Sequence, residues 1–313
     1  MSSFLPSFQT FFKGAATTTV ALGSLGVSLL YYGQEYLIYP SAFPPGSRTE
    51  EVPTPSEWNL LYEDVTLPCP DGVNIRAYLL LQRKQMPGAA HIGNHATESD
   101  DEYAADRPTV IMFHGNGGNI GHRVPLARVF VLKMRCNVLM VSYRGYGLSE
   151  GKPNEKGIKI DSQTALEYCK SHPVLKSTKI VLYGQSIGGA VSIDLAARNP
   201  NKIDALVLEN TFLSLPRLIP TALPMLGPFA WLCHQIWDSA NALPKIPSST
   251  PILMLSGLQD DIVPPSHMQE LFDIACRNGR SKGVWRDFPD GNHNNTCIQE
   301  GYWQAISDFI TKL

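Results

Sequence analysis

The strongest constraint in this sequence is a unit that recurs from residue 109 to the carboxyl end: a short apolar run, a turn, and a segment with helical periodicity. The runs are nearly continuous in apolar and β-branched residues, which is typical of strands covered on both faces. We expect strands over Thr109 to Phe113, Asn137 to Ser142, Lys179 to Tyr183, Ala205 to Leu208, Pro251 to Leu255 and Gly283 to Phe288. The helical segments are Arg123 to Met134, Asp161 to Ser171, Gly188 to Arg198, His267 to Arg277 and Ile298 to Lys312. This alternation predicts an α/β fold, with a mostly parallel sheet and helices on both of its faces.

Three further segments complete the predicted architecture. Alternating residues from Leu61 to Leu67 and from Val73 to Leu81 flank a Pro-Asp-Gly turn, which predicts an N-terminal antiparallel hairpin and brings the sheet to eight strands. Residues 84–108 lack periodicity and are predicted to form a surface loop. Residues 212–246 combine repeated prolines with leucines and tryptophans, a pattern that predicts a small cap of short helices inserted after a strand.

The amino-terminal segment is uncharged from Gly14 to Gln34, a run of 21 residues that would span about 31 Å as a helix. Threonines, serines and glycines dilute its apolar content, and aromatic residues flank it on both sides. We predict a membrane anchor over residues 1–36, with a single transmembrane helix at about 14–34, and a connector over residues 37–58. A buried helix and a cleaved signal peptide are the alternatives.

Cleavage is the weaker alternative, because the run ends in two leucines and two tyrosines rather than in small residues. We therefore favour an uncleaved signal anchor in the endoplasmic reticulum or another membrane of the secretory pathway. The few positive charges around the run mark its orientation weakly, and we favour a lumenal position for the rest of the chain.

Charge and motif composition exclude several kinds of partner. The chain has 26 Lys and Arg against 28 Asp and Glu, a net charge of -2, so it lacks the basic character that nucleic-acid binding requires. Its six cysteines form no C-x-x-C pair, no H-E-x-x-H occurs, and His91 and His95 lie in a stretch without helical character. We predict no metal and no cofactor. Most cysteines are expected to be free thiols, although disulfides stay open for a lumenal domain.

A serine at the end of a predicted strand carries the clearest chemical signal. After the run ending at Tyr183, and before the next helical segment, the chain contains Gly184-Gln185-Ser186-Ile187-Gly188-Gly189. This is G-x-S-x-G in the strand-turn-helix context that a nucleophile elbow needs, because bulky side chains beside so tight a turn would collide. The helix that follows would direct its free amides at negative charge beside the Ser186 hydroxyl. We predict that Ser186 is a nucleophile.

A serine hydroxyl needs a base, and the base needs an acid to orient it. Asp260 follows the predicted strand ending at Leu255, and His293 follows the last predicted strand. Both loops leave carboxyl ends of strands, which is where sites of open parallel sheets form. We predict that Asp260 is the acid and His293 the base.

Rival residues stand near each of these positions. Asp261 adjoins Asp260 and is the second choice for the acid, whereas Glu209, at another strand end, is expected to be structural. His267 lies within a helical segment and is expected at the surface. Asp290 is expected to form the Asp-Gly turn before His293.

Developing negative charge on a substrate carbonyl needs amide donors. The amide after the nucleophile belongs to Ile187, and a second is expected from the glycine-rich segment His114-Gly115-Asn116-Gly117-Gly118-Asn119, where we choose Asn116. That segment matches neither of the phosphate-binding glycine motifs. His114 is expected to shape this loop.

Taken together, these motifs resemble the α/β-hydrolase superfamily, and most closely the fungal bud-emergence (Bem) family; animal α/β-hydrolase domain-containing protein 13 is similar over the same span. The resemblance covers about residues 30–313 and rests on the segments Phe113 to Asn119, Tyr143 to Gly151, Gly184 to Gly189, Glu209 to Phe212 and the Asp260 and His293 loops. It implies a membrane-anchored serine hydrolase with a catalytic domain over residues 59–313 and a Ser186, Asp260, His293 triad. The 84–108 loop is longer than the family pattern.

The function predicted from these residues is two-step acyl transfer through an acyl-enzyme on Ser186. An apolar cap beside a membrane anchor favours a lipid ester, a lysophospholipid or an acyl-protein thioester as substrate, while the substrate-binding residues and any protein partners stay unassigned. A peptidase on the same fold is one alternative, and a non-catalytic membrane-anchored scaffold in cell polarity is another. The sequon at Asn294 adjoins His293, where a glycan would block the site, so we predict that it is unmodified.

Overall fold

Eight strands form one sheet in the computed structural model, which describes residues 8–86, 99–277, 279 and 283–313. Their order across the sheet is β1-β2-β4-β3-β5-β6-β7-β8. The strands are β1 (Glu63–Pro68), β2 (Asn74–Leu80), β3 (Thr109–Phe113), β4 (Asn137–Ser142), β5 (Ile180–Gln185), β6 (Ala205–Glu209), β7 (Ile252–Gly257) and β8 (Gly283–Phe288). The predicted α/β class and strand positions are confirmed, and three of the predicted strands have the observed bounds.

Strand direction follows the predicted pattern. β1 and β2 form the antiparallel hairpin, and β2 also pairs with β4 antiparallel, whereas every pairing from β4 through to β8 is parallel. β3 pairs with β4 on one side and with β5 on the other. The chain therefore reverses its direction of travel across the sheet at β3, and the crevice beyond the carboxyl ends of β3 and β5 is where a site is expected.

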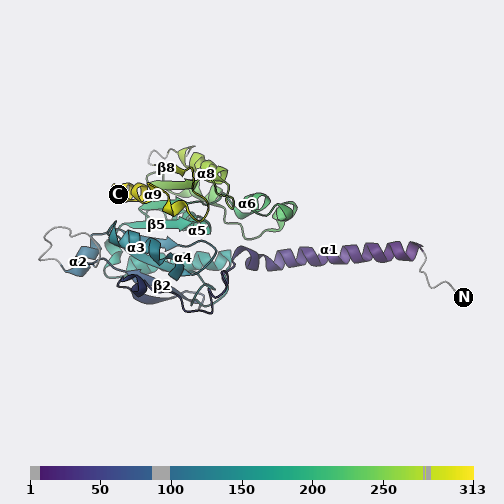
Figure 1. The fold of residues 1–313 in the computed structure, drawn as a ribbon, viewed down its shortest axis with the longest axis horizontal. Helices are drawn as coiled ribbons and strands as arrows, with labels where there is room; N and C mark the ends of the chain where they lie inside the picture. The colour runs from purple at the N-terminus through teal and green to yellow at the C-terminus, as the bar shows by residue number, and fades with distance from the viewer. Residues whose placement is uncertain (1–7, 87–98, 278, 280–282) are drawn as a thin grey trace.

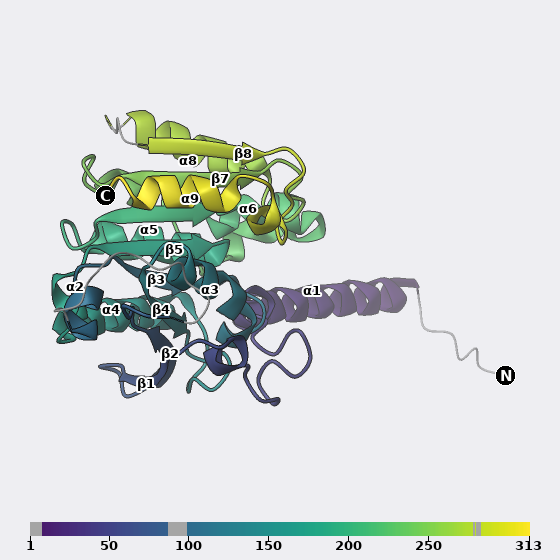
Figure 2. The ribbon, with the colours of Figure 1, turned by 60° about the vertical axis from the view of Figure 1, so that its left-hand side comes forward.

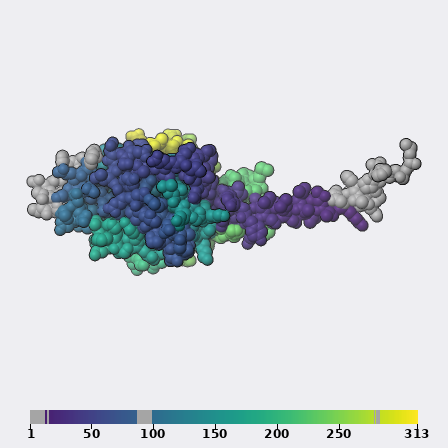
Figure 3. All heavy atoms as spheres, turned by 90° about the horizontal axis from the view of Figure 1, so that it is seen from below, coloured from purple at the N-terminus to yellow at the C-terminus, as the bar shows by residue number. Residues whose placement is uncertain are grey.

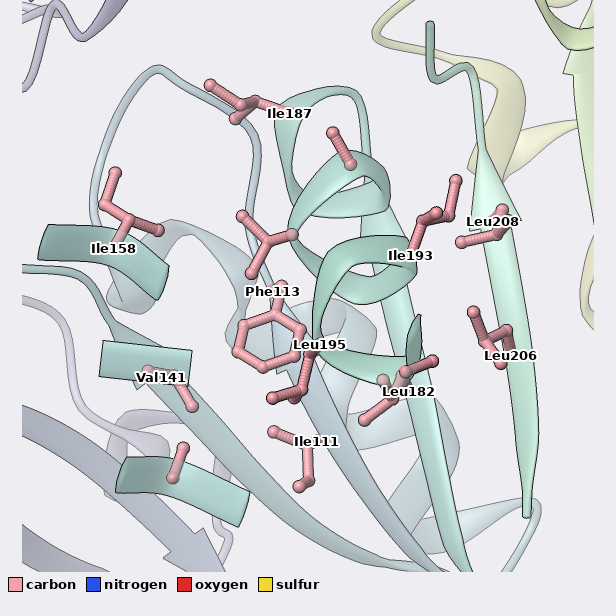
Figure 4. Close-up of a cluster of buried hydrophobic side chains, with 14 of the residues drawn as sticks. Ile111, Phe113, Val141, Ile158, Leu182, Ile187, Ile193, Leu195, Leu206 and Leu208 are labelled. Carbon is pink, nitrogen blue, oxygen red and sulfur yellow. The ribbon is translucent and has the colours of Figure 1, made fainter. Parts of the chain in front are cut away.

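Helices cover both faces of the sheet (Figure 2). Two buried clusters result: α3 and α9 pack on one face, and α4, α5 and α8 on the other. The helices are α3 (Val124–Leu132), α4 (Glu155–Ser171), α5 (Ile187–Arg198), α8 (Pro265–Arg277) and α9 (Tyr302–Ile310), with short 3₁₀ turns η1 (Pro55–Trp58), η2 (Ile120–Arg123), η3 (Leu175–Ser177) and η6 (Thr296–Ile298). In Figure 4, Ile193 of α5 lies beside Leu208 of β6, and Leu195 of α5 lies beside Phe113 and Ile111 of β3. This packing holds the amino end of α5 at the carboxyl edge of the sheet.

The segment predicted as the 84–108 loop contains a short helix. Residues 87–98, with His91 and His95, lie outside the described residues, but Asp100–Ala105 form α2. Ser99 caps it, accepting a hydrogen bond from the Glu102 amide while the Glu102 carboxylate accepts one from the Ser99 amide. Tyr103 is buried. The prediction of a loop throughout is wrong here, because a capping box starts a helix that the weak periodicity does not reveal.

The amino-terminal helix α1 (Phe8–Ile38) is 31 residues long and stands out from the body as a stalk (Figure 1). Seen from below, cap atoms lie beside its base (Figure 3). Within the described residues, no helix is both long enough and apolar enough to cross a membrane. The membrane anchor over residues 1–36 and its transmembrane helix at about 14–34 stay predictions.

The predicted connector and cap both pack on the body. The connector is not a free linker, since Tyr39, Ser47 and Val52 are buried. The cap between β6 and β7 consists of short helices, as predicted. These are α6 (Leu215–Ala222), η4 (Pro224–Leu232), α7 (Ser239–Ala242) and η5 (Leu243–Lys245).

Candidate active site

Ser186 stands on a strained turn between β5 and α5. Its φ of 55° and ψ of −123° lie outside the regions that residues with side chains normally occupy. A Cβ on Gly184 would overlap the Gly188 carbonyl, and one on Gly189 would come within 2.6 Å of the Thr211 Cβ. Hydrogen bonds fix the turn, because the Ser186 amide donates to the Glu209 carbonyl at 2.9 Å and the Thr211 hydroxyl donates to the Ser186 carbonyl at 2.7 Å. This is the geometry expected of a nucleophile elbow.

His293 and Asp260 meet beside this turn. The Nδ1 of His293 lies 2.7 Å from the Oδ2 of Asp260. The other carboxylate oxygen accepts hydrogen bonds from the Ile262 amide at 2.9 Å and the Val263 amide at 2.8 Å. Asp260 is therefore held in place from both of its oxygens, and it can keep the imidazole in the tautomer whose Nε2 accepts a proton.

The rival residues lie elsewhere. Asp261 is exposed, and Asp260 alone of the two contacts His293. His267 is buried, and its Nδ1 accepts a hydrogen bond from the Leu213 amide at 3.3 Å, so the expectation of a surface position is wrong. Its helix packs under the cap, and burial lowers the pKa of the ring.

A buried polar network lies behind the histidine loop, and the sequence did not indicate it. Glu209 is fully buried and accepts hydrogen bonds from the Tyr183 hydroxyl at 2.7 Å and the Tyr302 hydroxyl at 2.5 Å. The Gln185 amide group donates to Glu209 at 3.4 Å and to the His293 carbonyl at 3.1 Å. Burial raises the pKa of Glu209, and the two tyrosine hydroxyls act against this shift. The network ties the base of the elbow to the backbone of His293.

The predicted oxyanion residues border the same space. Ile187 begins α5, and Asn116 lies on the loop after β3, where its side chain donates to the Ile38 carbonyl at 3.3 Å and its carbonyl accepts from the Tyr146 hydroxyl at 2.9 Å. Beneath this loop, His114 is buried with its Nδ1 2.6 Å from the Gly115 carbonyl. Burial lowers the pKa of His114 to about 3, so the ring is neutral and shapes the loop.

A cavity of about 610 Å³ joins these groups, a volume within the range of small-molecule sites. Ser186, His293, Asn116 and Ile187 are among the residues that line it. The remainder is mostly apolar and comes from α1, the connector and the cap: Leu30, Leu37, Ile38, Phe43, Leu215, Leu218, Ile219, Leu223, Leu226 and Phe229. The base of α1 thus forms part of the wall, which the sequence did not indicate.

A polar clamp joins α1 to the cap. Gln34 is buried, and its side-chain oxygen accepts hydrogen bonds from the His234 amide at 2.9 Å and the Gln235 amide at 3.3 Å. Its side-chain nitrogen donates to the Leu232 carbonyl at 3.3 Å. Behind it, the Tyr39 hydroxyl donates to the Gln235 side chain at 3.0 Å. The wall that α1 contributes is therefore fixed by specific contacts as well as by apolar packing.

The donor sets needed for a metal are not assembled in the described part of the chain, where no group of three or more His, Cys, Asp or Glu side chains converges. The six cysteines are free thiols.

Comparison with known proteins gives relatives along nearly the whole chain. A family model described as the alpha/beta hydrolase fold matches residues 108–229. Protein bem46 of Schizosaccharomyces pombe is 47% identical over 302 residues, which is 96% of this chain and 93% of bem46. The protein named uncharacterized membrane protein YNL320W, of Saccharomyces cerevisiae, is 38% identical over 291 residues, 93% of each chain.

Solved structures share the architecture. The Pyrococcus furiosus esterase Pf2001 has a TM-score of 0.65 and 20% identity, covering 85% of this chain and 96% of the esterase. At that identity the likeness shows the fold, and the function must be argued from the site.

Proposed function

The chain belongs to the α/β-hydrolase fold family together with protein bem46, and from this premise we propose that it is a serine hydrolase that cleaves an ester or thioester next to a long apolar acyl chain. One observation carries the proposal. The Asp260–His293 pair, at 2.7 Å, and the strained Ser186 turn border one cavity whose remaining wall is mostly apolar. The esterase named among the fold neighbours supports the reaction class.

In the mechanism we propose, the Ser186 Oγ attacks the substrate carbonyl while the His293 Nε2 takes the hydroxyl proton. Asp260 accepts a hydrogen bond from the Nδ1 proton and stabilises the imidazolium. The amides of Ile187 and Asn116 donate to the tetrahedral oxyanion. His293 then returns the proton to the leaving alcohol or thiol. Water repeats the sequence on the acyl-enzyme and releases the carboxylic acid.

A panel of substrates tests the proposal. We expect the purified full chain to hydrolyse an octanoyl ester and an octanoyl thioester, with both activities lost in Ser186→Ala. The matched control is Ser171→Ala, which removes an exposed hydroxyl at the end of α4. A peptide amide in the same panel separates a peptidase from an esterase. Equal rates in the wild type and Ser186→Ala would reject a serine hydrolase and favour a scaffold.

We also propose that the protein associates with membranes. The name of YNL320W as a membrane protein supports this, as do exposed apolar side chains on α1: Val20, Leu22, Leu25 and Leu29. We expect the full chain to sediment with membranes in high salt, and replacement of Leu22, Leu25 and Leu29 by serine to release it. Equal sedimentation of both proteins would contradict a role for α1. The lumenal orientation stays a prediction, which protease protection of intact membranes tests.

A further inference from the structure

Arg123 lies beside the glycine-rich loop His114–Asn119, at the end of η2 and directly before α3. It lines the same cavity as Ser186 and His293. Its Nη2 lies 3.8 Å from the position that a Cβ on Gly115 would occupy, so the guanidinium stands over the first glycine of that loop. A permanent positive charge therefore borders a cavity that is otherwise mostly apolar.

This guanidinium has no protein partner among residues 8–86, 99–277, 279 and 283–313: it makes neither a hydrogen bond nor a salt bridge, and its Nε is buried and unpaired. Another buried arginine of this chain, Arg144, has anionic partners. It forms salt bridges with Asp71 at 2.7 Å and with Asp161 at 2.8 Å. A partly buried charge without compensation is costly, so a ligand that supplies the missing anion is favoured.

Glu209 is the carboxylate of the protein that could instead be the partner of Arg123. Burial raises the pKa of Glu209, and the charge of Arg123 partly offsets that rise. That carboxylate already accepts hydrogen bonds from Tyr183, Tyr302 and Gln185. It forms no salt bridge with Arg123 within the described chain. The guanidinium therefore keeps donors for a group that enters the cavity.

We propose that Arg123 binds an anionic oxygen group, phosphate or carboxylate, on the alcohol or thiol part of the substrate. The guanidinium fork matches either anion with two parallel hydrogen bonds. The apolar walls from α1 and the cap take the acyl chain, which leaves the arginine side of the cavity for the leaving group. The substrate is then an anionic amphiphile. This inference rests on the proposed function and narrows its substrate class.

Paired substrates with one acyl chain test the subsite. Decanoyl glycerol is compared with decanoyl glycerol phosphate and with a decanoyl ester of a hydroxy acid, in the wild type, Arg123→Gln and Arg123→Lys. We expect Arg123→Gln to lower kcat/KM about 10- to 100-fold for the anionic esters, through KM, and to leave the neutral ester within about twofold. Arg123→Lys should retain part of the preference, because an ammonium group supplies charge without the fork.

The matched control is Arg128→Gln, which removes the same charge from an exposed position on α3 outside the cavity. Its effect on all three esters should be small. An equal fall for neutral and anionic esters in Arg123→Gln would overturn the proposal and assign Arg123 to the support of Glu209 or the loop. No change for any ester would overturn it as well. The phosphate and carboxylate arms show which anion is preferred.

Binding to Ser186→Ala protein separates this inference from the proposed reaction. Calorimetry should show tighter binding of decanoyl glycerol phosphate than of decanoyl glycerol, with the difference removed by adding Arg123→Gln. Equal binding of both compounds would reject the anion subsite even where the wild type hydrolyses esters. A retained preference without any hydrolysis by the wild type would support the subsite and reject the hydrolase.

Discussion

Ser186 and His293 lie in the floor of the cavity, and Asp260 contacts His293. All three follow strands of one sheet, and hydrogen bonds that involve backbone groups hold each of them. In the roof, formed by the base of α1 from Leu30 onward with α6 and η4, leucines and other apolar side chains provide most of the surface. Met225 and Trp231 of the cap are 89% and 76% exposed, whereas Ser186 is 8% exposed. The floor therefore holds its polar side chains in fixed positions, whereas the roof presents mostly apolar surface.

The difference also concerns how each region is held. The floor rests on a fully buried carboxylate with tyrosine and glutamine donors, so its positions are determined by the core of the domain. Within the roof, the Gln34 clamp joins α1 to the cap, and apolar side chains provide most of the remaining wall. Changes in the floor should therefore affect the chemical step and stability, whereas changes in the roof should affect which substrates bind.

The largest effect is expected from Asp260→Asn. The amide would favour the wrong imidazole tautomer, so kcat should fall about 10⁴-fold, as in other serine triads. The measurement is the steady-state rate on a short ester. Asp261→Asn is the control, since Asp261 is exposed and should leave kcat within about twofold. A comparable loss in both variants would break the assignment of the acid.

Acid pH should lower the free energy of unfolding through His114, which lies beneath the loop after β3. Burial lowers the pKa of His114 to about 3 in the folded chain, whereas a histidine in the unfolded chain has a pKa of about 6.5. Between these two pH values the unfolded chain binds a proton that the folded chain does not bind. This contribution to stability is present above pH 6.5 and is lost as pH falls towards 3, at about 1.4 kcal/mol per pH unit. Urea unfolding at several pH values should show a shallower loss in His114→Asn. An unchanged slope would contradict a neutral buried ring.

Tyr302→Phe tests the network under the floor. Glu209 would lose the donor at 2.5 Å, and an incompletely satisfied buried carboxyl should cost about 1–3 kcal/mol of unfolding free energy. Urea titration measures it, with Tyr36→Phe on the exposed face of α1 as the control. Activity on a short ester should fall only a few-fold, because Tyr302 supports the His293 loop at a distance. Full stability in Tyr302→Phe would show that the network is dispensable.

The smallest effect is expected in the roof. Gln34→Leu removes the hydrogen bonds to Leu232, His234 and Gln235, so the wall from α1 should loosen. We expect KM for a long acyl ester to rise about 5- to 10-fold, with kcat on an acetyl ester unchanged. Tyr32→Leu, on the exposed side of the same helix, is the control. A fall in kcat on the acetyl ester would show that floor and roof are not separate.

The floor could be predicted from sequence because its signals are local. A glycine pattern between a strand and a helix located Ser186, and loops after strands located Asp260 and His293. The strand runs of the sheet were equally clear, since strands buried on both faces are continuously apolar.

The roof could not be predicted, because its contacts join residues far apart in the sequence. Gln34 and His234 are 200 positions apart, and no local pattern in an amino-terminal helix indicates a partner in the cap. The burial of His267 follows in the same way from how the cap packs over α8. The unpaired guanidinium of Arg123 is a property of its surroundings, which only the folded chain defines.

The central claim is that Ser186 is the nucleophile of a cavity that accepts an apolar chain. Intact-protein and peptide mass spectrometry after treatment with a long-chain alkyl fluorophosphonate tests it most directly. We predict one adduct per chain, located on Ser186, absent from Ser186→Ala and formed faster with a decyl than with an ethyl group. Folded wild-type protein that forms no adduct, or forms it on another residue, would contradict the claim.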